Sequence, residues 1–315
     1  MIFFRSVSSG KKAVGNRPVI LTLGNFDGLH LGHQALLRQV KEFAQQSNAA
    51  SMLLSFYPHP SAVIRNEVRL PLISLAEKFS RLEQLGLDCF CLQRFSKAFS
   101  RLSAEAFMQY LFENLNIHKL VLGADAHVGA DRTGDINFIR NWLTAQGRNP
   151  QETLFVPSFL EQSAKKIGSK QIRSALFAGD LAAVELALGR KYSISGRVIS
   201  GQKRGRLIGF STANLKCSHL ALPPLGVYNT KLTFCDGSGS YPAVSNLGMR
   251  PTVDGTRVLL ETHLLDYSGP EIYGREVEVQ FYSFVRAEQK FADFDALKQQ
   301  IKLDVQKAKQ YFGLL

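Results

Sequence analysis

Residues 19–33 read VILTLGNFDGLHLGH, and this stretch decides the fold of the first half of the chain. The apolar run 19–23 is typical of a buried strand, and the turn-forming residues at 24–28 end it. Apolar residues then recur at helical spacing from Leu31 to Ala44. The stretch therefore predicts a strand, a tight turn and a helix in succession.

The same alternation continues through the first half. We expect further strands at 51–56, 89–92 and 119–122, and helices over 74–85 and 104–115. Strands that alternate with helices pair in parallel, and the helices form the crossover connections. The first half is therefore expected to form a doubly wound α/β domain with a parallel sheet, whose ligands gather at the carboxyl ends of the strands.

The second half changes from helices to strands and turns. Short runs rich in β-branched and aromatic residues stand at 192–199, 226–234, 258–265 and 275–284, with Gly, Pro and Asp clusters between them. This pattern predicts an antiparallel barrel or sandwich. A last helix is expected from Phe294 to Phe312, packed on the strands by its apolar stripe.

A helical segment at 172–188 lies between the two patterns. We place the domain boundary near residue 190, which gives an α/β domain over 1–190 and a β domain over 191–315. A chain of 315 residues has ample material for two hydrophobic cores.

The net charge is strongly positive, because 38 Lys and Arg residues oppose 26 Asp and Glu residues to give +12. Nucleic acid, an acidic membrane surface and phosphorylated small molecules all suit such a charge. The chain has no apolar run of the roughly 20 residues that a bilayer requires, and its start is too short and wrongly ordered for a signal peptide. Cys89, Cys91, Cys217 and Cys235 form no C-x-x-C pair, which indicates a reduced, cytoplasmic setting with all four as core residues.

Residues 24–33 form the first candidate site. The N–H groups and the dipole at the start of the following helix favour a phosphate group. His30 and His33 lie three residues apart on its first turn, so both rings can face one side. Imidazoles placed there can donate to a nucleotide whose α-phosphate is attacked, which indicates nucleotidyl transfer. The competing interpretation is a capped turn with two surface histidines.

Residues 196–215, GRVISGQKRGRLIGFSTANL, form the second candidate site. Glycine lets backbone N–H groups close on a phosphate, and basic side chains between the glycines supply charge. The residues of this pattern are Gly201, Lys203, Arg204, Gly205, Arg206 and Gly209. The competing interpretation is a set of glycines in hairpin turns.

Oxygen donors and a carboxylate accompany this loop. Thr212 and Asn214 are two residues apart and share one face of an extended segment, where they suit Mg²⁺ held together with ATP phosphates. Glu261 lies in the mostly apolar stretch 259–265, and its carboxylate could take a proton from an attacking hydroxyl. Taken singly, the three residues also fit a strand end and a solvated glutamate.

Taken together, the motifs resemble the bacterial bifunctional riboflavin kinase/FMN adenylyltransferase family, also called FAD synthetases, over about the whole chain. The first half carries the adenylyltransferase segments in order, and the second half carries the kinase segments. These segments are 24–33, 55–60, 123–134 and 167–173, followed by 201–214, 224–228, 245–252, 261–266, 273–274 and 286–291. The resemblance implies a nucleotidyltransferase domain followed by a riboflavin kinase barrel with a C-terminal helix.

In the first domain the resemblance implies a site that binds ATP and transfers AMP to FMN. His30 and His33 would contact the ATP phosphates, and Arg173 would hold the triphosphate as the third catalytic residue. Asp27 would help to order the loop. The other binding positions that the resemblance implies are Gly24, Asn25, Phe26, Asp125, Arg132 and Ser169.

Five positions depart from the family's adenylyltransferase pattern, namely Tyr57, Ala126, Val128, Gly168 and Lys170. Tyr57 replaces an acidic residue, and Ala126 and Val128 replace aromatic rings of the kind that stack on the flat isoalloxazine. Lys170 brings a point charge in place of a hydroxyl. These departures leave open a second interpretation, in which the chain is a riboflavin kinase with a degenerate adenylyltransferase domain.

In the second domain the resemblance implies a riboflavin kinase. Thr212 and Asn214 would bind Mg²⁺–ATP, and Glu261 would activate the 5′-hydroxyl of riboflavin. Arg286 would help to hold the flavin product, and Gly201, Gly205 and Arg206 would belong to the phosphate loop. Transfer of the γ-phosphoryl group would be direct.

The sequence therefore predicts a cytoplasmic enzyme that makes FMN from riboflavin and FAD from FMN, with ATP and Mg²⁺. Its expected partners are these small molecules, without nucleic acid or membrane. An alternative of another class is a basic nucleic-acid-binding protein on a nucleotide-binding fold. Because the basic residues of the motifs are interleaved with phosphate-loop glycines, the pattern favours the enzyme.

Overall fold

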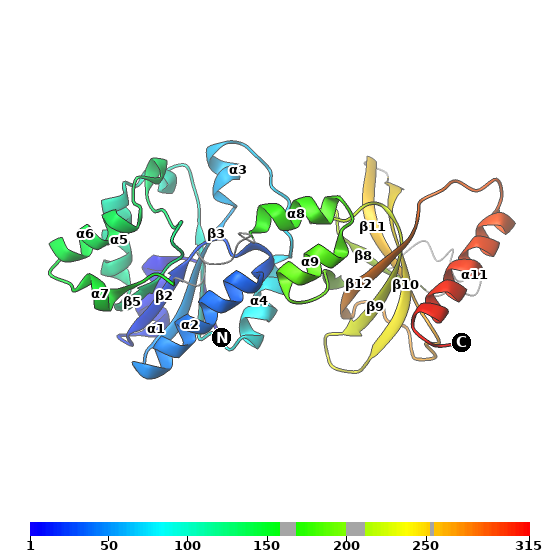
Figure 1. Cartoon of the computed structure of the whole chain (residues 1–315), viewed down its shortest axis with the longest axis horizontal. Helices are drawn as coiled ribbons and strands as arrows, with labels where there is room; N and C mark the ends of the chain where they lie inside the picture. Colours follow the sequence, from blue (N-terminus) through cyan, green and yellow to red (C-terminus); the bar gives the residue numbers. More distant parts are fainter. Residues whose placement is uncertain (158–167, 200–211, 253–254) are drawn as a thin grey trace. The chain divides into compact units, whose positions relative to one another are not determined.

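The computed structural model describes residues 1–157, 168–199, 212–252 and 255–315 (Figure 1). By its internal contacts the chain divides into two units. The first unit comprises Met1–Arg69 with Leu75–Gly168, and the second comprises Leu70–Ser74 with Ser169–Leu315. Each unit has its own sheet and its own hydrophobic core.

Among the described residues, the first unit is built on a six-stranded sheet in which all neighbouring strands are parallel (Figure 1). The strand order is β1-β4-β3-β2-β5-β6. The strands are β1 (Ile2–Phe4), β2 (Val19–Leu23), β3 (Ala50–Tyr57), β4 (Cys89–Arg94), β5 (Ile117–Val121) and β6 (Leu154–Phe155). The parallel α/β sheet predicted from the alternation of strands and helices is confirmed.

The two edge strands, β1 and β6, are not among the strands predicted from the sequence, and β1 shows why. Its three residues pair in parallel with Cys89–Cys91, while Ile2 and Phe3 remain exposed. A run of three residues carries no recognisable periodicity. This strand therefore depends on the backbone pairing that β4 offers.

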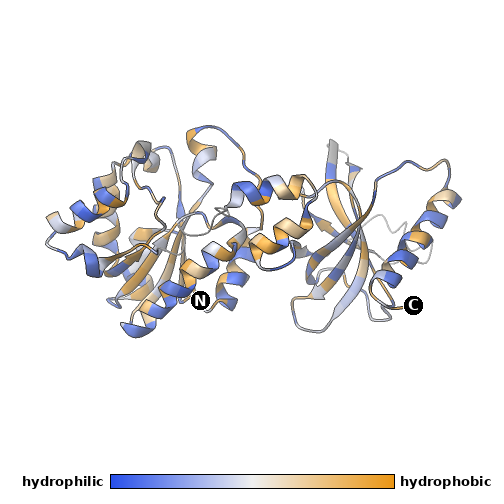
Figure 2. Ribbon diagram, viewed as in Figure 1, coloured by the Kyte–Doolittle hydropathy of each residue, from blue (hydrophilic) through white to orange (hydrophobic). Residues whose placement is uncertain are grey.

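Two helices of the first unit, α2 (Leu31–Gln46) and α5 (Ala104–Asn114), bury apolar side chains, and Figure 2 shows apolar residues alternating with polar ones along α2. In α2, Leu37 and Val40 are fully buried, and in α5 so are Met108 and Leu111. Each such side chain contributes roughly 1.5–3 kcal/mol. The helices are α1 (Gly10–Val14), α2 (Leu31–Gln46), α3 (Pro60–Ile64), α4 (Leu75–Gln84), α5 (Ala104–Asn114), α6 (Ile136–Ala145) and α7 (Pro150–Thr153).

The second unit contains an antiparallel barrel, with six strands in the described residues. Their order is β7-β12-β9-β10-β11-β8. The strands are β7 (Ser193–Arg197), β8 (Thr212–Lys216), β9 (Gly226–Phe234), β10 (Ser240–Thr252), β11 (Gly255–Leu264) and β12 (Glu276–Ala287). The two ends of the sheet meet, because the Ile199 N–H donates to the Asn214 carbonyl oxygen at 2.9 Å. Of the barrel and the sandwich that the sequence leaves open, the chain forms the barrel.

Two helices pack on the barrel core. Leu176 of α8 (Ser169–Phe177) and Val184 of α9 (Leu181–Leu188) share that core with Leu232 and Phe281. The segment 172–188 is thus two helices rather than one, because Gly179 between them takes a φ of 78°. By their contacts both helices group with the barrel, although they precede the predicted boundary near residue 190. The boundary near residue 190 between two independently folding domains stays a prediction.

The C-terminal helix α11 (Phe294–Tyr311) packs on β9 and β10. Its Ala308 and Val305 lie in a small cluster with Val227 and Val244. The helix begins at a capping carboxylate, since Asp293 accepts a hydrogen bond from the Ala296 N–H at 2.8 Å. The predicted terminal helix and its packing on the strands are confirmed.

The cysteines are only partly core residues. Cys89, Cys91 and Cys217 are buried, and burial raises the pKa of each of these thiols. Cys235 is exposed, so the prediction for this residue is wrong. It follows the last residue of β9 at the turn to β10, where its side chain lies outside the core. None of the described helices is long and apolar enough to cross a membrane.

Candidate functional site

At the carboxyl end of β2 the chain turns into α2 through residues 24–33, which we call the histidine loop. The backbone is left-handed at Phe26 and Leu29, with φ values of 46° and 45°, and at Gly28, with a φ of 78°. Residues other than glycine rarely adopt a positive φ, so contacts with the surrounding residues must stabilise the left-handed backbone of Phe26 and Leu29. Phe26 and Leu29 are both buried and anchor the loop in the domain.

His30 and His33 lie together at the start of α2. His30 caps the helix, and its Nδ1 accepts a hydrogen bond from the His33 N–H at 3.3 Å. The two rings stack with their centroids 3.6 Å apart, and the Phe26 ring stacks on His33 at 4.5 Å. The three-residue spacing thus brings both imidazoles to one side of the helix start, as the sequence predicts.

The surroundings of His33 favour its uncharged form. Burial, and after it the neighbouring His30 and Lys78, lower the pKa of His33 well below its ordinary value. Its Nδ1 is buried and has no hydrogen-bond partner among the described residues. A neutral imidazole with an unsatisfied nitrogen, next to a helix N-terminus, is suited to a phosphate group whose charge would favour protonation.

Lys78 of α4 reaches the histidine loop. Its Nζ donates a hydrogen bond to the carbonyl oxygen of Asn25 at 2.7 Å. Burial lowers the pKa of Lys78, and the carboxylate of Asp27 opposes this shift by favouring the charged form. No sequence motif marks Lys78, and only the fold brings α4 beside the loop.

The segment 55–60 meets the histidine loop at Asn25. The Nε2 of His59 lies 2.9 Å from the side-chain nitrogen of Asn25, and its Nδ1 accepts from the Ser61 N–H at 3.1 Å. His59 is a second residue of this site that the predicted set omits, although it lies in a quoted motif. Tyr57, which replaces the family's acidic residue, is 62% exposed.

The segment 123–134 forms a small hairpin. Val128 and Gly134 exchange backbone hydrogen bonds of 2.8 and 3.0 Å. The Val128 side chain is buried in the core of the first unit, and Ala126 packs against that core. Ala126 and Val128, which stand where the family has aromatic residues, therefore contribute to the hydrophobic core in this chain.

The same hairpin places Asp125 and Arg132 near one another. Both are exposed. The Nδ1 of His127 lies 2.8 Å from the Asp125 carbonyl oxygen and 3.1 Å from Nη2 of Arg132. The two predicted binding residues thus share a polar neighbour that the sequence analysis does not single out.

Ser169 and Arg173 lie on α8. Ser169 is its first residue, and Arg173 follows one turn later and is half-buried. Lys170 is exposed, and Gly168 is the last residue of the first unit. Contact of Arg173 with a nucleotide stays a prediction.

In the barrel, residues far apart in the sequence lie in one row across five strands. Asn214 faces Glu261, Glu261 faces Asn246, Asn246 faces Val227, and Val227 faces Arg286. Residues that face each other in a sheet project their side chains on the same side. We call the four polar members of this set, Asn214, Glu261, Asn246 and Arg286, the polar row, and three of them are predicted site residues on one face.

The oxygen donors at Thr212 and Asn214 fit a magnesium ion that arrives with ATP. The two residues are on the same face of β8, and Asn214 is 4% exposed. Its Nδ2 lies 3.5 Å from the Thr212 carbonyl oxygen, which leaves the amide oxygen as a donor to a cation. Among the described residues, no cluster of three or more His, Cys, Asp or Glu side chains could hold a metal ion.

Glu261 is held by Arg250 of the neighbouring strand. The Nε and Nη2 atoms of Arg250 donate to the two carboxylate oxygens at 3.2 and 2.6 Å. The Nη1 atom lies 3.6 Å from Glu288. The hydrogen bonds to Glu261 raise the pKa of Arg250. Arg250 is not among the predicted site residues, because only the pairing of β10 with β11 brings it to Glu261.

Arg286 joins the barrel to the C-terminal helix. Its Nε and Nη2 donate to the Asp304 carboxylate at 3.0 and 2.7 Å, and Gln300 donates to the same carboxylate at 2.9 Å. Asp304 is 3% exposed. A structural role of Arg286 is thus evident, and its contact with a flavin stays a prediction. The predicted residues Gly201, Gly205 and Arg206 lie outside the described residues.

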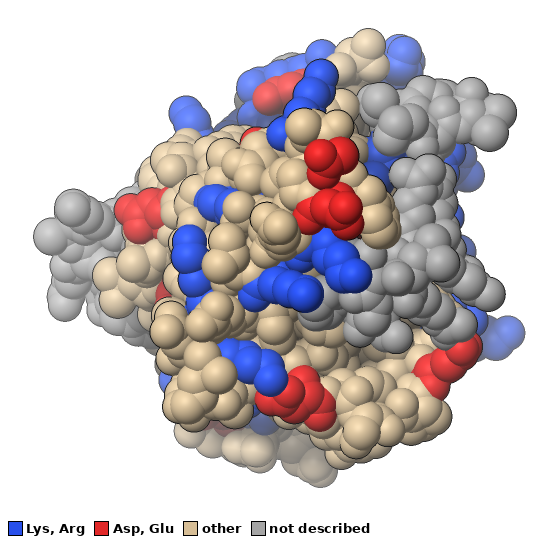
Figure 3. Space-filling view, turned by 90° about the vertical axis from the view of Figure 1, so that its right-hand side faces the viewer, with Lys and Arg blue, Asp and Glu red and all other residues tan. Residues whose placement is uncertain are grey.

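Charge on the face seen in Figure 3 is mixed. Among the described residues of this face, basic side chains are interspersed with acidic ones. Continuous basic stripes are typical of nucleic-acid-binding surfaces.

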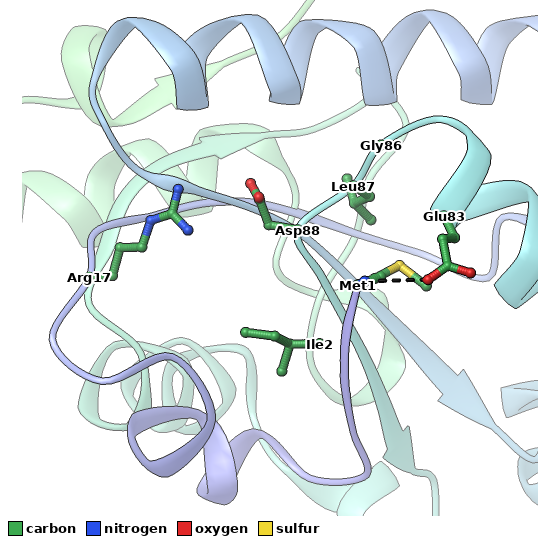
Figure 4. A pocket seen from close by; sticks show the side chains of 7 residues that line it. All are labelled: Met1, Ile2, Arg17, Glu83, Gly86, Leu87 and Asp88. Atoms are coloured by element: carbon green, nitrogen blue, oxygen red, sulfur yellow. Dashed lines mark hydrogen bonds and ion pairs between the residues drawn. The ribbon is translucent and has the colours of Figure 1, made fainter.

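A pocket near the amino ends of β1 and β4 is separate from the candidate sites (Figure 4). Its lining residues are Met1, Ile2, Arg17, Glu83, Gly86, Leu87 and Asp88. The Asp88 carboxylate accepts hydrogen bonds of 2.9 and 2.7 Å from the Ser51 N–H and hydroxyl. Because ligands of open parallel sheets bind at the carboxyl ends of strands, we do not place the site in this pocket.

Comparisons with known proteins match both halves of the chain. A family described as riboflavin kinase matches residues 188–312, and one described as FAD synthetase matches residues 12–171. A bifunctional riboflavin kinase/FMN adenylyltransferase of Pseudomonas fluorescens is 36% identical over 296 residues, or 93% of each chain. Its counterpart in Escherichia coli K12 is 37% identical over 298 residues, covering 94% of this chain and 93% of that protein. The crystal structure of a macrolide-efflux protein from Streptococcus pneumoniae matches with a TM-score of 0.80 and 26% identity, over 98% of this chain and 99% of that one.

Proposed function

The chain belongs to the family of bifunctional riboflavin kinase/FMN adenylyltransferases, and from this premise we propose that it converts riboflavin to FMN and FMN to FAD, using ATP in both steps. One observation carries the proposal: the chain holds the histidine loop at the carboxyl end of a parallel strand and the polar row on a barrel. Each lies within the part of the chain that the corresponding family matches.

In the barrel, Glu261 is the proposed general base. It takes the proton of the riboflavin 5′-hydroxyl, whose oxygen bonds to the γ-phosphorus of ATP while the bond to the leaving ADP breaks. Asn214 faces Glu261 on the next strand, so a phosphate held at Asn214 is close to this carboxylate. Thr212 and Asn214 would hold Mg²⁺ together with the ATP phosphates, and the bound ion would neutralise part of their charge.

In the α/β domain, the histidine loop is the proposed site of adenylyl transfer. A phosphate oxygen of FMN bonds to the α-phosphorus of a second ATP, and the bond to the leaving pyrophosphate breaks. His30 and His33 donate hydrogen bonds to the phosphate oxygens on which charge grows, and the N-terminus of α2 favours the same charge. That Ser169 and Arg173 of α8 hold the triphosphate stays an expectation from the family's sequence pattern.

The alternative is a riboflavin kinase with an inactive first domain. The departures at Tyr57, Ala126 and Val128 concern an exposed side chain and two packing positions, and none of them lies in the histidine loop. The absence of aromatic rings at positions 126 and 128 would weaken flavin stacking more than phosphate chemistry. The ordered pair of imidazoles therefore favours the bifunctional enzyme.

Part of the positive charge also fits phosphorylated small molecules better than nucleic acid. Lys170, Lys203, Arg204 and Arg206 lie in the phosphate-facing motifs, as does Arg173. The proposed partners are accordingly riboflavin, FMN and ATP, with Mg²⁺.

Product analysis of the purified chain tests the proposal. Riboflavin with Mg²⁺–ATP, and FMN with Mg²⁺–ATP, are incubated separately, and the flavins are resolved by chromatography. The bifunctional enzyme produces FMN and FAD in the first mixture and FAD in the second. FMN without FAD would establish the kinase-only alternative, and no flavin product in either mixture would contradict both.

A further inference from the structure

Lys78 links α4 to the histidine loop across 53 residues of sequence. Its ammonium group donates to the Asn25 carbonyl oxygen at 2.7 Å, and the Ser55 hydroxyl lies 3.4 Å from the same oxygen. A hydrogen bond from a charged donor is shorter and stronger than one between neutral groups. Lys78 is thus the stronger of these two restraints on the Asn25 carbonyl.

This carbonyl belongs to the peptide that enters the left-handed part of the loop. The next residue is Phe26, with a φ of 46°, and its ring stacks on His33. A peptide group is planar, so fixing its oxygen also fixes the N–H of the following residue. The hydrogen bond from Lys78 therefore restrains the peptide group between Asn25 and Phe26. This peptide group immediately precedes the unfavourable left-handed backbone of Phe26, whose ring contacts His33.

The charge of Lys78 also acts on the loop. Lys78 is among the groups that lower the pKa of His33, and Asp27 in the loop favours the charged form of Lys78. The ammonium group is therefore electrostatically coupled to both the acidic and the imidazole side chains of the loop. A nucleotide phosphate that approaches His33 enters the same positive field.

We propose that Lys78 is a positioning residue for adenylyl transfer, which holds the Asn25 carbonyl and thereby the loop shape that presents His30 and His33 to the nucleotide phosphates. The proposal rests on the proposed function of the first domain. It assigns to Lys78 a role that acts through the loop backbone and does not require contact with a reacting atom.

The test compares Lys78→Met with Lys41→Met in the full chain. Lys41 is a matched control, because its Nζ also donates to a backbone carbonyl, that of Leu85, at 2.6 Å in the same domain. Two readouts are taken: the rates of FAD formation from FMN and of FMN formation from riboflavin, and amide hydrogen exchange over residues 24–33 without substrate.

We expect Lys78→Met to lower kcat for FAD formation by about 10- to 100-fold, as for loss of a charged hydrogen bond. FMN formation stays at the wild-type rate, because it takes place in the barrel. Exchange over residues 24–33 becomes faster in Lys78→Met and stays unchanged in Lys41→Met. Lys78→Arg, which keeps a charged donor, restores part of the rate and the protection.

Wild-type exchange over residues 24–33 in Lys78→Met would overturn the proposal. So would equal losses of FAD formation in the two methionine variants. If the wild-type chain forms no FAD, the proposed function of the first domain fails, whereas the exchange comparison still decides whether Lys78 holds the loop.

Discussion

The guanidinium of Arg250 binds both carboxylate oxygens of Glu261, at 3.2 and 2.6 Å, from the adjacent strand of the barrel. Two parallel bonds fix the plane and direction of the carboxylate as well as its distance. Glu261 also faces Asn214 on its other neighbouring strand. The proposed base is therefore oriented by Arg250 beside the proposed magnesium ligand.

Replacement of Arg250 should slow the kinase reaction. We expect Arg250→Gln to lower the rate of FMN formation by about 10- to 100-fold, because a carboxylate displaced by about 1 Å loses its alignment with the hydroxyl. Arg250→Lys, which keeps the charge with a single donor centre, should lose less. FAD formation from supplied FMN should remain unchanged in both variants.

Arg197→Gln is the matched control for this measurement. It removes an arginine from an exposed pair with Glu276 in the same barrel. Equal rates of FMN formation in Arg250→Gln and Arg197→Gln would contradict an orienting role for Arg250.

Binding of ATP at the histidine loop should take up a proton. The pKa of His33 is lowered in the free protein by burial and by His30 and Lys78, while Asp27 is the acidic group of the loop. Phosphate charge favours the protonated ring and so raises this pKa on binding. ATP affinity at this site should therefore increase as the pH falls from about 8 toward about 6.

Calorimetry in two buffers of different protonation enthalpy measures this uptake. His33→Ala should lose the part of the uptake that belongs to the first site and keep any that belongs to the barrel. Identical proton uptake in wild type and His33→Ala would show that His33 does not titrate on binding.

The Arg286–Asp304 pair should make a large contribution to the stability of the second unit. Asp304 is almost fully buried, and its removal leaves the Arg286 charge without its main partner. We expect Asp304→Asn to lower the free energy of unfolding by about 3 kcal/mol, measured by urea denaturation. Asp266→Asn, at the exposed pair with Lys309, should cost less than about 1 kcal/mol. Similar losses in the two variants would contradict the assignment of Asp304 as a buried anchor of α11.

The local sequence pattern predicts the central strands of the first unit, β2 to β5, and four of the six described strands of the second unit, β7, β9, β11 and β12. Burial imposes those periods directly on the sequence. The strands β8 and β10 and the helix α6 are not among the predicted elements. The three residues of β1 are too few to show a period, and their strand arises from pairing with β4. The separation of α8 from α9 depends on one left-handed glycine, Gly179, inside an otherwise helical pattern.

The candidate sites likewise contain some contacts that the sequence predicts and others that only the fold brings about. His30 and His33 could be placed together from sequence because one helix turn relates them. Lys78, Arg250 and Asp304 could not, because each reaches its partner through tertiary pairing of separate elements. Their partners Asn25, Glu261 and Arg286 are all among the predicted residues, whose roles stay predictions, and the fold adds the residues that contact them.

Reciprocal inactivation is the most direct test that this chain makes FMN and FAD at two separate sites. Flavin products of His30→Ala/His33→Ala and of Glu261→Gln are resolved by chromatography after incubation with Mg²⁺–ATP and either riboflavin or FMN. We predict that the histidine variant forms FMN from riboflavin but no FAD from either flavin. Glu261→Gln should form FAD from FMN but no FMN from riboflavin. Loss of both reactions in both variants, with each protein still folded, would contradict the division of the chemistry between the histidine loop and the barrel.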